Sequence, residues 1–65
     1  MGFQFSRHAL EKARERGISI NEIRRTVQRG AKHVQNGKIV ADFGHIRVVY
    51  KKIDGVCSII TVMIR

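Results

Sequence analysis

The sequence contains no proline, one cysteine and only five acidic residues among its 65. Because proline is absent, no strand of a sheet would lose a ladder hydrogen bond to it. The single cysteine, Cys57, excludes an intrachain disulfide framework and is typical of a reducing compartment, so we expect a cytoplasmic protein. No apolar run approaches the roughly 20 residues that span a bilayer, and the N-terminus lacks a signal-peptide layout, so we expect no membrane association.

Several kinds of chemical site are also missing. The three histidines and Cys57 show no close paired spacing of the zinc-binding kind. The sequence contains no glycine-rich phosphate loop and no nucleophile elbow. We therefore expect neither a metal nor another cofactor.

What the chain does have is positive charge. Thirteen lysines and arginines give a net charge of +8, with a pI near 10.9. The excess is spread evenly: residues 6–29 hold seven basic and three acidic groups, and residues 30–65 hold six and two, so each part carries +4. A chain of this length allows one domain, spanning residues 1–65, and that domain should itself be positive. A polyanion, nucleic acid first, is the natural partner, although many small basic proteins bind nothing specific.

Helix signals occupy the first half of the chain after a short apolar strand at residues 1–5. Ser6 is a plausible N-cap for a first helix, and Gly17 lies where a C-terminal cap belongs. Residues 19–22 form a capping box, and Gly30 ends the second helix. The outer side of this second helix is basic, with Arg24, Arg25 and Arg29.

From residue 31 the hydrophobic period changes to two, which indicates strands. We predict strands at about 31–35, 38–43, 46–52 and 56–64, joined by turns at Asn36-Gly37, Gly44-His45 and Asp54-Gly55. The predicted fold is α+β, with two N-terminal helices packed on one face of a four- or five-stranded antiparallel sheet.

The turns also predict which residues share a face of the sheet. The face under the helices should carry Val34, Ile39, Ala41, Phe43, Ile46, Val48, Tyr50, Ile59, Thr61 and Met63. The other face should carry His33, Lys38, Val40, Asp42, Arg47, Val49, Lys51, Ser58, Ile60, Val62 and Ile64. Arg47 lies opposite Asp42 in this register. A face that mixes aliphatic and cationic side chains usually binds something, either a second copy of the chain or a nucleic acid.

Three stretches resemble a known family. The segment His8-Ala9-Leu10-Glu11-Lys12-Ala13-Arg14-Glu15-Arg16-Gly17-Ile18-Ser19, and the later stretches at residues 46–50 and 59–62, are similar to a widespread bacterial and archaeal domain of unknown function. That family is distantly related to the RelE and BrnT toxins. The resemblance implies a small RelE-like α+β domain that cleaves or binds RNA, including ribosome-bound mRNA, and is neutralised by an acidic antitoxin. One departure is Lys12, where relatives often have an arginine that would grip phosphate better.

Two residues are candidates for catalysis. Arg47 would hold a phosphate as charge develops during RNA cleavage, a part that the resemblance also implies for a strand arginine. The alternative for Arg47 is a simple cross-strand ion pair with Asp42. His8 matches the histidine of the family and could transfer a proton near neutral pH; the alternative is an exposed histidine at a helix start.

Further cations are candidates for nucleic-acid binding as a group, although the pattern of each one alone is that of a solvated surface residue. These candidates are Lys12, Arg16, His33, Lys38, His45 and Lys51. Tyr50 and Cys57 alternate onto the core face and are predicted to be buried.

The function predicted from these observations is a RelE-like, RNA-directed toxin domain, with metal-independent endoribonuclease cleavage as its mechanism if it is an enzyme. The alternative is a non-catalytic module that binds nucleic acid or protein. Such a module would form a homodimer through a strip of Val49, Ile60 and Val62.

Overall fold

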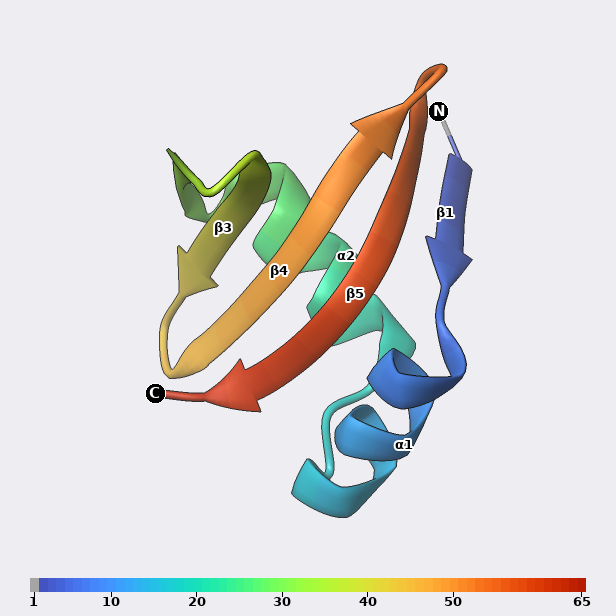
Figure 1. Ribbon diagram of the computed structural model, residues 1–65. Helices are drawn as coiled ribbons and strands as arrows, with labels where there is room; N and C mark the ends of the chain where they lie inside the picture. The colour runs from blue at the N-terminus through green and yellow to red at the C-terminus, as the bar shows by residue number, and fades with distance from the viewer. Residues whose placement is uncertain (1) are drawn as a thin grey trace.

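The computed structural model describes residues 2–65 and has the predicted succession of strand, two helices and four strands (Figure 1). The elements are β1 (Gly2–Phe5), α1 (Arg7–Arg16), α2 (Ile20–Arg29), β2 (Ala31–Gln35), β3 (Lys38–Phe43), β4 (Ile46–Ile53) and β5 (Val56–Ile64). Residue 1 of the predicted first strand lies outside the described residues. None of the helices in residues 2–65 has the length and apolar character needed to cross a membrane.

The five strands form one sheet in the order β1-β5-β4-β3-β2. The prediction of an antiparallel sheet is wrong at one edge, because β1 runs parallel to β5. The other three strand pairs are antiparallel, as expected for strands joined by tight turns. The sheet is therefore mixed. A tight turn in the sequence predicts that the two strands it joins are antiparallel. No such turn joins β1 to β5, because both helices and three further strands lie between them in the chain.

The helix ends form as the sequence predicts. The hydroxyl of Ser6 accepts a hydrogen bond from the backbone N–H of Ala9 at 3.0 Å, which caps α1. Gly17 ends α1 with a φ of +66°, a conformation that glycine adopts without steric cost. At α2, Ser19 and Glu22 exchange the two hydrogen bonds of a capping box, at 3.1 and 2.9 Å.

A single apolar cluster joins both helices to one face of the sheet. Helix α2 lies behind β4 and β5 in the view of Figure 1, and α1 packs against β5. The helices contribute small or branched residues that allow close packing, and the strands contribute the alternating residues beneath them. The buried members of the cluster are Ala9, Ala13, Ile18, Ile23, Val27, Ala41, Ile46, Val48, Tyr50, Cys57, Ile59 and Val62. Tyr50 and Cys57 are buried as predicted.

A β-bulge in β5 overturns part of the predicted register. Tyr50 pairs with Ile59, as predicted, but the next residue of β4, Val49, pairs with Thr61, so Ile60 is an extra residue. Beyond the bulge the faces are exchanged relative to the prediction. Val62 and Ile64 lie on the helix side, where Val62 is fully buried, and Thr61 and Met63 lie on the opposite side.

Gly30 brings the end of α2 close to β3. A Cβ atom at this position would lie 2.5 Å from the carbonyl oxygen of Thr26 and 2.7 Å from that of Asp42. Both neighbours are backbone atoms that cannot turn away. The absence of a side chain at Gly30 therefore sets the spacing between α2 and β3.

Candidate nucleic-acid interface

The side of the sheet turned away from the helices is the candidate site, and we call it the open face. Residues paired directly across antiparallel strands share a face. The pairs Val40–Val49 and Asp42–Arg47 therefore lie opposite the pairs Ala41–Val48 and Phe43–Ile46 of the helix side. The open face includes His33, Lys38, Val40, Asp42, Arg47, Val49, Lys51, Ser58, Thr61 and Met63.

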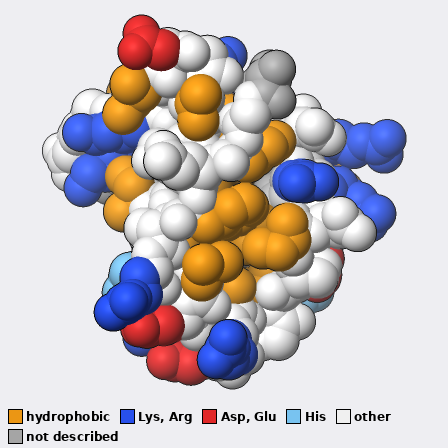
Figure 2. Space-filling model, turned by 90° about the vertical axis from the view of Figure 1, so that its right-hand side faces the viewer, with side chains coloured by type: hydrophobic (Ala, Val, Ile, Leu, Met, Phe, Trp, Pro, Cys, Tyr) orange, Lys and Arg blue, Asp and Glu red, His pale blue; other side chains and the backbone are white. Residues whose placement is uncertain are grey.

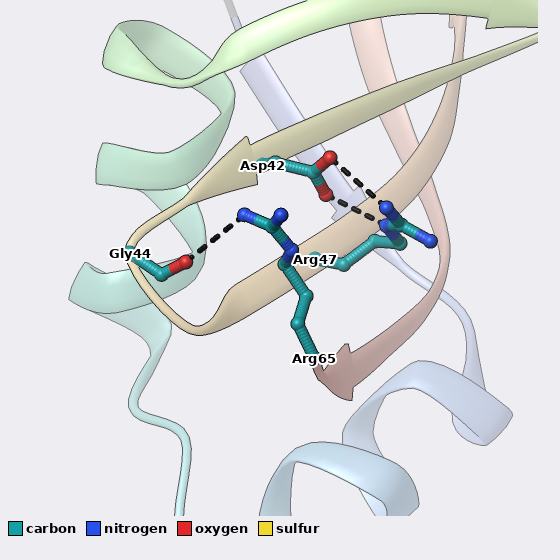
Figure 3. Close-up of polar contacts among 4 residues, drawn as sticks. All are labelled: Asp42, Gly44, Arg47 and Arg65. Carbon is teal, nitrogen blue, oxygen red and sulfur yellow. Dashed lines mark hydrogen bonds and ion pairs between the residues drawn. The ribbon is translucent and has the colours of Figure 1, made fainter.

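Arg47 is held in a fixed orientation on this face by Asp42 (Figure 3). The guanidinium donates from Nε to Oδ1 of the carboxylate at 2.7 Å and from Nη2 to Oδ2 at 3.1 Å. The side chain of Arg47 is 38% exposed and that of Asp42 is 15% exposed. The two bonds use two of the five N–H groups of a guanidinium. Within residues 2–65 the remaining N–H groups of Arg47 have no partner, so they are available to an anion.

The charges around Asp42 favour its ionised form. The hydrogen bonds from Arg47 lower the pKa of the Asp42 carboxyl, and the nearby charges of Arg65 and His33 lower it further, whereas partial desolvation opposes them. The same carboxylate raises the pKa of Arg47. The pair therefore stays charged and paired at neutral pH, with Asp42 as the group that positions the arginine.

Arg65 is a member of this site that the sequence analysis missed. Its Nη1 donates to the carbonyl oxygen of Gly44 at 3.1 Å (Figure 3). Its backbone N–H donates to the carbonyl oxygen of His45 at 2.7 Å. The bulge sets the side on which Arg65 lies, because Ile64 pairs with Ile46 on the helix side and Arg65 therefore follows Met63 on the side of the open face. The two consecutive apolar residues at 59–60 break the period of two, and this break was the signal in the sequence that could have indicated the bulge.

Aliphatic side chains fill the centre of the open face. Val40 is only 6% exposed although it does not belong to the apolar cluster that joins the helices to the sheet, so its neighbours on the sheet cover it. Val49, its partner across the strands, is half-buried. Val40 and Val49 form the apolar strip of the open face, and the side chain of Arg47 lies beside it. Interactions of Arg47 with an anion are therefore less screened there than in bulk water.

The six predicted nucleic-acid-binding residues divide between two layers. His33, Lys38 and Lys51 lie with Arg47 on the open face, and His45 lies in the turn between β3 and β4. Lys12 and Arg16 lie on α1 instead.

On α1 the two cations share one carboxylate, that of Glu15. Lys12 approaches it at 3.4 Å and Arg16 at 3.9 Å. Part of their positive charge is therefore compensated locally, which weakens their claim as phosphate ligands.

The predicted proton-transfer group, His8, is not brought to Arg47. It lies exposed in the first turn of α1, in the helix layer, whereas Arg47 lies on the open face. The histidine that the fold does place on the open face is His33, opposite Val40. Within residues 2–65 no group of three or more His, Cys, Asp or Glu side chains is arranged to hold a metal ion.

A scan against protein families matches residues 5–64 to a domain of unknown function, DUF4258. The chain is a member of the DUF4258 family. This membership confirms the resemblance that the segments at residues 8–19, 46–50 and 59–62 indicated. No curated protein matches the chain in sequence.

A solved structure shares the fold of this DUF4258 protein. A chain in the crystal structure of the toxin–antitoxin complex RelBE2 from Mycobacterium tuberculosis superposes with a TM-score of 0.67 at 17% sequence identity. The match covers 98% of this chain and 96% of that one. The RelE-like fold predicted from the sequence is thus confirmed as an architecture, with the mixed sheet as the correction.

Proposed function

We propose that this DUF4258 protein is the toxin of a toxin–antitoxin pair and that it acts on RNA through the open face. The observation that carries the proposal is the guanidinium of Arg47, fixed by Asp42 and exposed beside an apolar strip. The net charge of +8 supports a polyanionic substrate. The fold shared with a chain of a toxin–antitoxin complex supports the assignment to such a pair.

The proposed reaction is metal-independent cleavage of RNA at a phosphodiester. The 2′-oxygen forms a bond to phosphorus, the bond from phosphorus to the 5′-oxygen of the next nucleotide breaks, and a 2′,3′-cyclic phosphate and a 5′-hydroxyl result. A base removes the proton of the 2′-hydroxyl, and the leaving oxygen gains a proton. Arg47 stabilises the non-bridging oxygens as their charge increases, and this kind of electrostatic stabilisation contributes much of a catalytic effect.

Proton transfer is assigned to His33 in preference to His8. Both histidines suit acid–base chemistry near neutral pH. His33 shares the open face with Arg47 and lies close enough to Asp42 to influence its pKa, whereas His8 lies in the helix layer. In this scheme His33 accepts the proton of the 2′-hydroxyl and solvent protonates the leaving oxygen.

The proposed partner is an acidic antitoxin that covers the open face. An acidic segment would compete with phosphate for Arg47 and for its neighbours Lys38 and Lys51, which lie on the same face. Ribosome-bound mRNA is the proposed substrate of the free toxin, so an isolated chain mixed with naked RNA would cleave slowly.

The test is induced expression in a bacterial host, read out as growth and as transcript cleavage with mapped ends. We expect growth arrest with the parent, and loss of cleavage by about a hundredfold or more with Arg47→Ala. We expect a large loss with His33→Ala and little change with His8→Ala. The matched control is Arg14→Ala on α1, which removes one exposed positive charge away from the open face.

Circular dichroism melting of each variant separates loss of function from loss of fold. Equal growth and no cleavage with the parent, Arg47→Ala and control chains, all folded, would refute the toxin proposal. Cleavage that disappears in His8→Ala and persists in His33→Ala would move the proton transfer to α1.

The second candidate function is a non-catalytic nucleic-acid-binding or interaction module. The separation of His8 from Arg47 favours it, because the predicted catalytic pair does not converge. Its predicted homodimer strip is incomplete, since Val62 is buried under the helices. RNA binding that depends on Arg47 without any cleavage would support this module.

A further inference from the structure

Helix α2 presents a row of polar side chains on the side away from the core. Their spacing of three and four residues places them on one face of the helix. The row consists of Asn21, Arg24, Arg25, Gln28 and Arg29, all exposed. Together with Phe43 of β3, these residues line a groove of about 520 Å³, which we call the α2 groove.

The arginines of the α2 groove are not neutralised. Within residues 2–65, Arg24, Arg25 and Arg29 form no ion pair, and no acidic side chain lines the groove. Arg24 lies over the ring of Phe3, with 5.8 Å between its guanidinium carbon and the ring centroid. Three cations along one helix face, without a carboxylate between them, are matched to a ligand with repeated negative charges.

Phe43 supplies an exposed aromatic ring beside these charges. It is 39% exposed, although its cross-strand partner Ile46 is almost completely buried. Phe43 and Arg25 also line an adjacent hollow of about 150 Å³, together with Gly44, His45, Ile46 and Glu22. The hollow is partly open to solvent, and its volume is roughly that needed for one aromatic ring.

The one carboxylate near this hollow belongs to Glu22, and it is already committed. It accepts the backbone N–H of Ser19 at 2.9 Å, and this bond lowers the pKa of the Glu22 carboxyl. Its negative charge makes the hollow unsuitable for phosphate and leaves it to an uncharged ring. Phosphate groups would therefore lie on the other side of Phe43, along the arginines.

We propose that the α2 groove binds single-stranded RNA, with one base stacked on Phe43 and the flanking phosphates held by Arg25 and Arg29. Stacking on an aromatic ring beside a positive track is how proteins bind single strands without reading their sequence. An acidic protein is a poorer match, because a protein interface needs an apolar centre and this groove offers a single ring. The site lies on the helix side of the sheet, and its existence requires neither cleavage nor Arg47.

The first experiment measures binding of a fluorescently labelled single-stranded uracil oligoribonucleotide across a range of salt concentrations. We expect Phe43→Leu to weaken binding at least about fivefold, because one stacked base is lost, and Phe43→Trp to retain it. We expect the double variant Arg25→Gln/Arg29→Gln to reduce the slope of log K against log salt by about 0.7 for each phosphate that the protein no longer neutralises.

The matched control is the double variant Arg7→Gln/Arg14→Gln on α1, which removes the same charge from outside the groove. Both residues of the control belong to α1. The side of the molecule formed by β1 and α1 shows hydrophobic side chains at its centre and charges of both signs around them (Figure 2). If the control weakens binding as much as the groove variant does, the interaction is a diffuse effect of net charge and the proposal is wrong. Circular dichroism melting confirms that each variant is folded.

The second experiment distinguishes this proposal from the proposed function. RNA containing 4-thiouridine is cross-linked to the protein by light, and the attached peptide is identified by mass spectrometry in the parent and in Arg47→Gln. Cross-links at Phe43 that persist in Arg47→Gln support the groove even if no cleavage occurs. Cross-links confined to β3 and β4 residues of the open face would overturn the groove and leave the proposed function standing. A glutamate oligopeptide that displaces the RNA from the parent, and that binds Phe43→Leu much more weakly than the parent, would assign the groove to an acidic protein instead.

Discussion

The two basic regions of this protein hold their arginines in different ways. On the open face, the Arg47 side chain is 38% exposed and is fixed by two hydrogen bonds to Asp42. In the α2 groove, Arg25 and Arg29 are exposed and have no ion-pair partner within the described chain. A fixed guanidinium suits one phosphate in one orientation, as a reaction requires. Mobile guanidiniums suit a flexible backbone, where charge matters more than geometry.

The most informative way to test this contrast is to replace arginine by lysine in each region. We expect Arg47→Lys to lose most of the activity, about tenfold or more, because an ammonium cannot bridge Asp42 and a phosphate as the planar fork does. We expect Arg25→Lys to change RNA affinity less than about twofold, because the charge is retained. Cleavage and binding measured on the same preparations give both values, and equal effects in the two regions would contradict the contrast.

Gly30 lies where the two regions meet, so its substitution should damage both. In Gly30→Ala the new methyl group would meet the backbone carbonyls of Thr26 and Asp42, which cannot move without separating α2 from β3. We expect a loss of about 1–3 kcal/mol in the free energy of unfolding, measured by urea denaturation.

The control for Gly30→Ala is Gly2→Ala, where a Cβ would meet nothing within 4 Å. We expect its effect on the free energy of unfolding to stay within about 0.5 kcal/mol. Equal stability of the two variants would show that the close approach at Gly30 is relieved by small shifts.

Ser6 provides a test that should affect the open face and spare the α2 groove. Its hydroxyl caps α1 and also donates to the carbonyl oxygen of Ile60, the bulged residue, at 3.1 Å. We expect Ser6→Ala to lower the free energy of unfolding by about 1 kcal/mol and Ser6→Thr to restore most of it. Amide chemical shifts should change in β5 near the bulge but not along α2; shifts confined to α1 would mean that the bulge holds without the hydroxyl.

The smallest expected effect concerns two carboxyls whose pKa values are both lowered, one on the open face and one beside the α2 groove. The pKa of Asp42 is lowered first by hydrogen bonds from the charged group of Arg47 and further by that charge, whereas the pKa of Glu22 is lowered mainly by a hydrogen bond from a backbone N–H. Because a lowered folded-state pKa stabilises the fold above the unfolded value, both contributions should be lost as the pH falls below about 4. Added salt should weaken the shift at Asp42 more than at Glu22, which NMR titration of the carboxyl carbons would detect. Equal salt sensitivity would mean that the charge of Arg47 adds little to the effect of its hydrogen bonds on the pKa of Asp42.

Most of the fold could be predicted from local signals. The serine caps, the closing glycines and the Asn36-Gly37 and Asp54-Gly55 turns act within a few residues, and the structure confirms them. The register between β3 and β4 followed from the turn between them, which is why the pairing of Asp42 with Arg47 was predicted correctly.

Features that depend on distant contacts were not predicted. The parallel pairing of β1 with β5 and the bulge at Ile60 arise where the chain ends meet, and no turn specifies them. Because the bulge was missed, Val62 was assigned to the wrong face and Arg65 was overlooked. The open face itself was predicted, whereas the separation of His8 from Arg47 depends on how α1 packs.

The extra residue in β5, Ile60, breaks the alternation of faces along the strand, and the residues that follow it pair regularly with β4. Because Ile60 has no partner in β4, a chain without it would still place Thr61 opposite Val49 and Val62 opposite Val48. Deleting Ile60 would therefore straighten the strand and leave every later side chain on its present face. Inserting a residue beyond the bulge, where nothing is unpaired, would instead exchange the two faces up to the C-terminal end of the strand.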